Sequence, residues 1–445
     1  MRLFRKILFW CHLVTGVAVA LVVLIMSVTG VLLTYEKQML AWADARAVQV
    51  PAPAPGARPL AVDELMRRVG QAETGTPTQI SWLAGENRPV RVAYGREKTI
   101  YADPYTGAVL GQGATTMRAF FRKVTDWHRW LAQSGDGRDR GKMITGASNL
   151  GFLFLVLSGF YLWWPRTWTR EAFRSVTLFR RGLRAKARDF NWHNVIGLWS
   201  FVPLLIIVAS AVVISYPWAS NLVYRLAGEE PPAQSGPGGG PGGPQAQAGR
   251  AGAAGERGGR EGGREGGGRE GGGREGGGAR EGGEGRGGGG GDVLAGIDPL
   301  LATARGRVDG WRTISLTLPK SADAPVVFNI DRGTGGQPQK RASLTLDRAT
   351  GAEVKWEPFG AGTLGRRMRS ILRFAHTGEV LGIVGQTIAG LVSLGAAVLV
   401  WTGLSLSLRR LRAWRGRRAR FGPDGGGTAG AVRDRKRRAG AAAAR

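Results

Sequence analysis

Four long stretches of the chain are almost free of charged residues. They fall within residues 7–35, 143–165, 194–218 and 364–408. At ~1.5 Å of rise per residue, a helix of about 20 apolar residues crosses the ~30 Å hydrocarbon core of a bilayer. The pattern therefore predicts four transmembrane helices, the last of them preceded by an interfacial helix that begins at residue 364.

The first stretch follows three basic residues, Arg2, Arg5 and Lys6, as the core of a signal peptide would. Its apolar run is much longer than the ~7–15 residues of a signal core, however, and no convincing small-residue cleavage site follows it. We expect this stretch to stay in the protein as a membrane anchor.

Two polar regions, residues 36–114 and 292–358, separate the first span from the second and the third from the fourth. Each combines a helix-like stretch with alternating strands and contains a D-x-x-T-G turn, in DPYTGAVLG (103–111) and DRATGAEVKW (347–356). The order of span, polar region and span thus occurs twice. The sequence predicts a polytopic α-helical membrane protein with four transmembrane helices and two extracytoplasmic small α+β domains, related by internal duplication.

Residues 229–291, before the second polar region, are dominated by Gly, Pro, Arg and Glu. This composition cannot form a packed core. From residue 256 to residue 286, seven arginines are balanced by seven glutamates, so we interpret the segment as a neutral, disordered tether. Arg-Gly repeats also occur in RNA-binding segments, but the glutamates and the external location argue against that role, and we expect no nucleic-acid partner.

The net charge of +29 is concentrated before the first span, in the 166–190 loop and in the 409–445 tail. These three segments hold 24 basic residues against four acidic ones. An even number of spans places them on one side of the membrane, and the positive-inside rule makes that side the cytoplasm. We expect a multi-pass protein of the bacterial inner membrane, embedded in the lipid bilayer, with both termini in the cytoplasm.

The chain has four histidines, and each lies near a predicted membrane boundary. His12 and His193 begin spans one and three on the cytoplasmic side. His128 lies on the apolar face of an amphipathic segment, residues 115–132, and His376 immediately precedes span four, so both are external. Because the two boundaries are ~30 Å apart, the predicted pairs are His12 with His193 and His128 with His376.

Two histidines from different helices can hold a haem iron between them. The single cysteine, Cys11, excludes covalent C-x-x-C-H attachment, so we predict two b-type haems with the four histidines as axial ligands of the iron. A lone histidine at a helix end is also often only a capping or interfacial residue. Zinc usually takes four ligands, and each side offers two histidines. The count favours haem.

Haem propionates would need cations at the same boundary, although such cations also contact lipid headgroups. The candidates are Arg118, Arg122, Arg129, Arg366, Arg369 and Arg373. Small-residue dipeptides in the spans would let helices or a porphyrin approach closely. These dipeptides are Thr29-Gly30, Ser158-Gly159 and Thr402-Gly403.

Taken together, seven strings resemble the PepSY-associated transmembrane family, which includes bacterial inner-membrane reductases of ferric siderophores. The strings are FWCHLVTG (9–16), DPYTG (103–107), DWHRWL (126–131), LSGFYLWWP (157–165), NWHNVIG (191–197), DRATG (347–351) and HTGEVLG (376–382). The resemblance covers nearly the whole chain. It implies PepSY-type external domains, membrane-embedded b haems on the same four histidines, and electron delivery to a periplasmic Fe(III) chelate or siderophore. A cytoplasmic flavoprotein and membrane quinol both remain open as electron donors.

Three functions compete on this pattern. The first is a di-haem b electron-transfer protein, a membrane-bound oxidoreductase of the ferric-chelate reductase type. The second is a non-enzymatic membrane sensor or assembly factor whose PepSY domains bind a peptide or peptidase, which predicts that the histidines are dispensable. The third is transport of a solute or proton, but the spans contain almost none of the acidic residues that such a relay needs. We expect the first.

Overall fold

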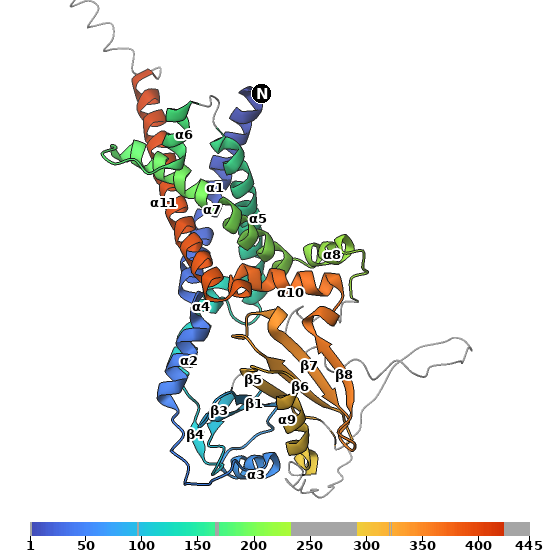
Figure 1. The fold of residues 1–445 in the computed structure, drawn as a ribbon. Coiled ribbons are helices and arrows are strands. Elements are labelled where there is room, and N and C mark those ends of the chain that lie inside the picture. Colours follow the sequence, from blue (N-terminus) through green and yellow to red (C-terminus); the bar gives the residue numbers. More distant parts are fainter. Residues whose placement is uncertain are drawn as a thin grey trace, which may run out of the picture.

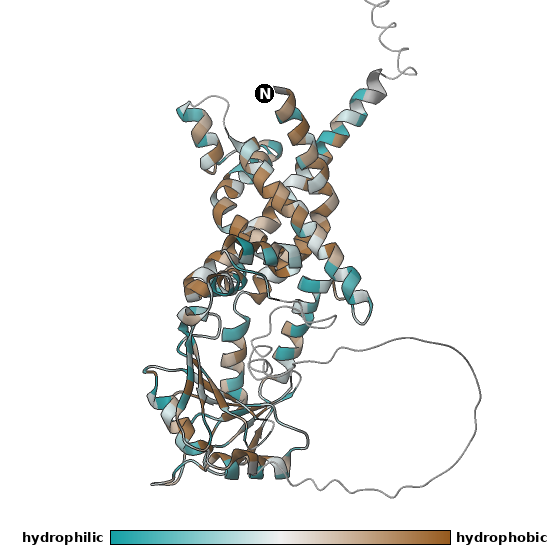
Figure 2. Cartoon of the chain, turned by 90° about the vertical axis from the view of Figure 1, so that its right-hand side faces the viewer, coloured by the Kyte–Doolittle hydropathy of each residue, from teal (hydrophilic) through white to brown (hydrophobic). Residues whose placement is uncertain are grey.

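The computed structural model describes residues 2–95, 98–164, 169–232, 292–319, 321 and 323–421. It places a bundle of long helices at one end of the protein and a β-sheet domain at the other (Figure 1). Four of the described helices are long and apolar enough to cross a membrane, and apolar residues are concentrated in the bundle (Figure 2). The chain is a multi-pass membrane protein with an α+β domain.

The bundle consists of α1 (Arg2–Leu33), α5 (Gly137–Trp163), α7 (Ala185–Ser215) and α11 (Gly382–Phe421). Helices α1 and α7 each pack against both α5 and α11, so α1 and α7 lie on one diagonal of the bundle. The four predicted spans are found. However, α7 begins earlier and α11 ends later than the apolar pattern indicates, because basic residues of the predicted loop and tail continue these helices.

Shorter helices lie at both ends of the bundle. α2 (Glu36–Ala47) follows α1, and α8 (Pro217–Leu226) follows α7. α4 (Thr115–Trp130) packs against α1, and α10 (Leu364–His376) packs against α7. We call this end, next to the sheet, the sheet side. The opposite end, with the N-terminus, α6 (Arg170–Thr177) and the end of α11, is the terminal side (Figure 1).

Eight antiparallel strands form one sheet, in the order β4-β3-β2-β1-β5-β6-β7-β8. The strands are β1 (Gln79–Leu83), β2 (Val90–Tyr94), β3 (Lys98–Ala102), β4 (Val109–Gly111), β5 (Thr313–Thr317), β6 (Val326–Asp331), β7 (Arg341–Leu346) and β8 (Glu353–Pro358). β1 pairs with β5, with Ser81 opposite Ser315 and their hydroxyl oxygens 2.9 Å apart. The two domains expected from the sequence therefore share a single sheet.

One face of this sheet carries the hydrophobic core of the domain. Alternate strand residues such as Ile80, Leu316 and Phe328 are fully buried, as the period of two in a strand requires. They pack with the buried residues of α3 (Val62–Ala72) and α9 (Ile297–Gly306). Short 3-10 turns occur at Asp292–Leu294, Pro338–Lys340, Phe359–Ala361 and Glu379–Leu381. Both halves of the chain thus contribute to one core.

The two D-x-x-T-G motifs form the turns predicted for them. Asp103 Oδ1 and Asp347 Oδ1 each accept a 2.8 Å hydrogen bond from a backbone N–H two or three residues later. The last residues of the motifs, Gly107 and Gly351, have φ of +74° and +70°, which favours glycine. The motifs therefore shape the sheet, and their aspartates are occupied by backbone contacts.

Each half of the chain has the same order of elements. A span is followed by two helices, a four-stranded meander, a short helix ending near a histidine, and a second span. This is the order that an internal duplication would produce. Residues 233–291 of the predicted tether and residues 422–445 of the predicted tail lie outside the described residues.

The predicted topology can be tested with single cysteines in a Cys11→Ser background. Asp309→Cys lies in an exposed turn of the sheet domain, and Arg174→Cys lies exposed on α6. Treated with a membrane-impermeant maleimide, intact spheroplasts should label only Asp309→Cys, and both variants should label after lysis. Labelling of Arg174→Cys in intact cells would place the terminal side outside and reverse the topology.

Candidate functional site

Two of the predicted ligand histidines face each other on the sheet side. His128 lies in the last turn of α4, and His376 is the last residue of α10. Their ring centres are 6.2 Å apart, with the planes at 56°. Helix α4 buries Phe121 and Val124, and their spacing places His128 on the same face. We call these two residues the sheet-side pair.

The other two histidines, His12 and His193, form the terminal-side pair. His12 lies on α1 and His193 on α7, the two helices of one diagonal. His12 contacts α5 through Ser158, and His193 contacts α11 through Thr402. Along α7, His193 precedes Ile207, which contacts His376, by 14 positions, or about 21 Å. The two pairs therefore lie at opposite ends of the apolar bundle.

A hydroxyl group from a bundle helix holds Nδ1 of three of the four imidazoles. The partners are Ser158 for His12 at 2.8 Å, Thr402 for His193 at 2.9 Å and Thr29 for His128 at 2.9 Å. Each hydroxyl oxygen also lies 2.6–2.8 Å from the carbonyl oxygen four residues earlier in its own helix. Because that carbonyl can only accept, it takes the single hydroxyl proton. The hydroxyl oxygen therefore accepts from the imidazole Nδ1–H.

The fourth imidazole reaches the same state through the backbone. Nδ1 of His376 lies 2.9 Å from the carbonyl oxygen of Ile207, which can only accept. Ser210 is as far from His193 along α7 as Thr29 is from His12 along α1. Its buried hydroxyl donates to the same Ile207 carbonyl at 2.9 Å. In the second half of the chain, the imidazole of His376 therefore bonds to the Ile207 carbonyl in place of a hydroxyl, and the Ser210 hydroxyl donates to that same carbonyl.

All four imidazoles therefore carry a proton on Nδ1 and present the lone pair of Nε2. Among the described residues, no hydrogen bond reaches any of these Nε2 atoms. Burial lowers the pKa of His128 to about 4 and also lowers the pKa of His376, so both rings are neutral at neutral pH. A neutral imidazole with Nδ1–H fixed by an oxygen acceptor is the form that binds a metal through Nε2.

A glycine follows each of the three hydroxyl residues and lies against the same imidazole. If the glycine were replaced by a residue with a β-carbon, the distance from that carbon to Cε1 of the ring would be 3.2 Å at Gly159, 3.4 Å at Gly403 and 3.7 Å at Gly30. The distance for Gly159 is tighter than ordinary van der Waals contact, and the distance for Gly403 is at its lower limit. Each Ser-Gly or Thr-Gly dipeptide therefore fixes its ring by a hydrogen bond and leaves room for it.

The donor set and the spacing fit a haem iron with two axial imidazoles. Two imidazoles bound to one metal ion through nitrogens about 2 Å away have ring centres about 6 Å apart, which agrees with the 6.2 Å of the sheet-side pair. In the described part of the chain, no three His, Cys, Asp or Glu side chains gather in one place, as a structural zinc ion would need.

Two of the six candidate arginines lie beside the sheet-side pair without an ion pair to any described carboxylate. Arg129 directly follows His128, and Arg373 precedes His376 by three residues. Burial lowers the pKa of both guanidinium groups, and the charge of Arg129 lowers the pKa of Arg373 further. Like charges held this close favour an anion between them, such as a carboxylate.

The other four candidate arginines are placed differently. Arg118 donates to both carboxylate oxygens of Asp44, at 2.8 and 2.5 Å, so its charge is neutralised where α2 meets α4. Arg369 donates to a hydroxyl of α8 at 2.7 Å. Arg122 and Arg366 are exposed. Only the two arginines beside the pair combine proximity with unneutralised charge.

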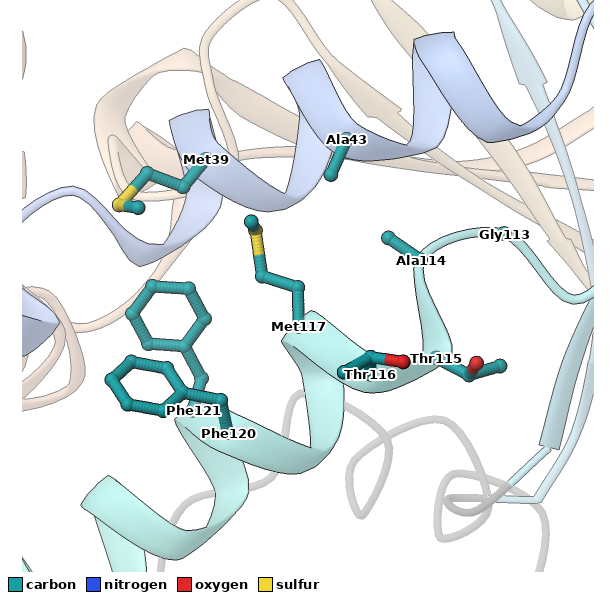
Figure 3. Close-up of a pocket in the computed structure, with 9 residues that line it drawn as sticks. All are labelled: Met39, Ala43, Gly113, Ala114, Thr115, Thr116, Met117, Phe120 and Phe121. Atoms are coloured by element: carbon teal, nitrogen blue, oxygen red, sulfur yellow. The ribbon is translucent and has the colours of Figure 1, made fainter.

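A hollow of about 550 Å³ opens between α2 and the start of α4 (Figure 3). Met39 and Met117 point into it from the two helices, and Phe120 and Phe121 lie at one end (Figure 3). Its lining contains no titratable side chain. Although it shares α4 with His128, the hollow offers no titratable group for proton transfer.

A buried carboxylate beside the terminal-side pair was missed by the sequence analysis. Asp189, one turn before His193, accepts a 2.8 Å hydrogen bond from the hydroxyl of Ser405. It also pairs with Arg188 at 2.9 Å and Arg409 at 3.4 Å. These contacts tie α7 to α11 close to the contact that holds the histidine. The signal in the sequence was a lone acidic residue within the basic start of a span.

Comparison with known proteins identifies one family. The model described as "PepSY-associated TM region" matches residues 9–410. This match includes both histidine pairs, most or all of each span and all eight strands. No curated protein matches the chain.

Proposed function

The chain belongs to the PepSY-associated transmembrane family, and from that premise we propose that it is a di-haem b protein that passes electrons across the membrane to an Fe(III) chelate. The observation that carries the proposal is the common state of the four histidines. Each has Nδ1–H committed to an oxygen and Nε2 presented. They stand as one pair at each end of a four-helix bundle.

In this proposal, one haem binds between His12 and His193 and the other between His128 and His376. When bound, each haem would supply a one-electron redox centre. The hydroxyl and carbonyl acceptors on Nδ1 hold each ring in one orientation and raise the basicity of the ligating nitrogen. Arg129 on α4 and Arg373 on α10 would place their positive charges near a haem propionate at the membrane boundary.

The interior between the two pairs contains a cluster of buried apolar residues from α5, α7 and α11, namely Val156, Leu204, Val208, Val392 and Ala396. The side chain of Ser200 is also buried in this part of α7. On the terminal-side half of this region, the rings of Phe160 and Phe201 stack with centres 4.1 Å apart. A closely packed, mostly apolar interior favours electron transfer without side reactions with water.

The two ends of the bundle suit different partners. The sheet side, which we place outside the inner membrane, would meet the Fe(III) chelate or siderophore, and weaker chelation of Fe(II) would release the metal after reduction. The terminal side, which we place in the cytoplasm, would receive electrons from a flavoprotein or from membrane quinol. This arrangement makes the protein a membrane-bound oxidoreductase of iron uptake.

Changing any one histidine to alanine should remove one haem and leave the other. Purified wild-type protein should contain about two b haems per chain by pyridine haemochrome, and each of His12→Ala, His193→Ala, His128→Ala and His376→Ala about one. The retained haem serves as the internal control for folding. If both haems survive a change at one pair, the ligand assignment is wrong for that pair.

Removing a hydroxyl that holds Nδ1 should raise the midpoint potential of the haem on that histidine, because a less basic imidazole stabilises Fe(III) less. A neutral hydrogen bond is worth about 1 kcal/mol, or roughly 40 mV for one electron. Redox titration of Ser158→Ala and Thr402→Val should show this shift for the terminal-side haem only. Ser407→Ala is the control, because that hydroxyl bonds to a carbonyl of its own helix.

Neutralising the cations beside the sheet-side pair should have the opposite effect. Arg129→Gln and Arg373→Gln each remove a positive charge that favours the reduced haem, so the midpoint potential of the sheet-side haem should fall by tens of mV. Arg122→Gln, an exposed charge on the same helix as Arg129, is the matched control. Equal shifts in the variants and the control would refute a specific role for these arginines.

A further inference from the structure

A second hollow lies on the terminal side, where the start of α7 meets α11. Its volume is about 360 Å³, and its lining consists of Arg184, Lys186, Ala187, Phe190 and Leu406. The two cations lie at the start of α7, and the other three residues are apolar. Phe190 is 59% exposed, so the apolar part of the hollow is open to the surroundings of the bundle.

The equivalent place in the first half of the chain is closed. Arg5 precedes His12 by seven residues, as Lys186 precedes His193. Arg5 donates to the carbonyl oxygens of Leu162 at 2.5 Å and Trp164 at 3.0 Å, at the end of α5. Helix termini leave such carbonyls unpaired, so the arginine and the helix end satisfy each other.

The second half has no such helix end. Leu406 follows Thr402 by four residues, as Leu162 follows Ser158 in α5. Helix α11 continues to Phe421, so its carbonyls here are paired within the helix. Lys186 therefore finds no helix end whose carbonyl groups could accept from it, as the end of α5 accepts from Arg5. The equivalent place in the second half stays open as a hollow.

The charges around the hollow are unequally neutralised. Asp189 pairs with Arg188 and Arg409. Among the described residues, no carboxylate forms an ion pair with Arg184 or Lys186. The hollow thus combines two cations without a described carboxylate partner and an apolar surface at the end of a membrane bundle. The cations suit a phosphate group, and the apolar surface suits a hydrocarbon chain attached to it.

We propose that this hollow binds an anionic phospholipid from the leaflet on the terminal side. Its phosphate would lie between Arg184 and Lys186, with an acyl chain along Phe190 and Leu406. Basic pockets between spans at such a boundary bind anionic headgroups. Because Leu406 is one turn beyond Thr402, the lipid would support the α7–α11 contact that holds His193. The site itself needs no haem, so it stands apart from the electron-transfer proposal.

The test uses full-length protein in detergent and measures bound lipid by native mass spectrometry during titration with phosphatidylglycerol or phosphatidylcholine. Each cation near an anionic surface contributes about a fivefold factor in binding, so Arg184→Gln with Lys186→Gln should weaken phosphatidylglycerol binding roughly 25-fold. The double change Arg170→Gln with Arg174→Gln, which removes the same charge from α6, should leave it within about twofold of wild type. Phe190→Ser should weaken it several-fold.

Four outcomes would overturn the proposal. The first is equal loss in the hollow and α6 variants, which would indicate only general surface charge. The second is equal binding of phosphatidylcholine, which would show that the anionic headgroup is not recognised. The third is displacement of the lipid by inorganic phosphate without an effect of Phe190→Ser, which would leave a simple anion site. The last is unchanged lipid binding in the hollow variant together with loss of cross-linking to an acidic redox protein, which would make the hollow a protein-docking site.

Discussion

The hydrogen bond from each imidazole Nδ1–H to an oxygen of a bundle helix is the interaction on which both candidate sites depend. A histidine inside an apolar bundle can rotate, change tautomer or bond through either nitrogen. Here each hydroxyl has its own proton committed to a helix carbonyl, so it can only accept from the ring. The tautomer, the ring plane and the direction of Nε2 all follow from that single commitment.

The bundle turns these four local contacts into two sites. His12 and His193 lie on the diagonal helices α1 and α7, while α4 and α10 bring the other two histidines against the same helices. The shared sheet supports this arrangement from outside, because pairing of β1 with β5 joins the two halves that carry α4 and α10. Each half contributes one histidine to each pair, so neither site can form from one half alone.

Much of this arrangement could be predicted from the sequence, because its signals are strong and local. Long apolar runs indicated the spans, and the amphipathic pattern around His128 placed that residue on the bundle face of its helix. The joining of the two α+β domains could not be predicted, because the pairing of β1 with β5 depends on strand edges more than 200 residues apart.

The hydroxyl partners of the histidines could not be predicted for a related reason. Ser158 and Thr402 appeared only as small residues, and their role depends on which helix faces which. Asp189 was overlooked within a basic segment.

The most direct test of transmembrane electron transfer uses full-length protein in sealed vesicles that contain a ferric chelate and ferrozine, with dithionite and an ionophore for charge compensation added outside. Trapped iron should turn ferrous much faster with wild-type protein than in protein-free vesicles or with His12→Ala. If haem-loaded wild-type protein reduces the trapped iron no faster than protein-free vesicles do, electrons do not cross the membrane through the two haems.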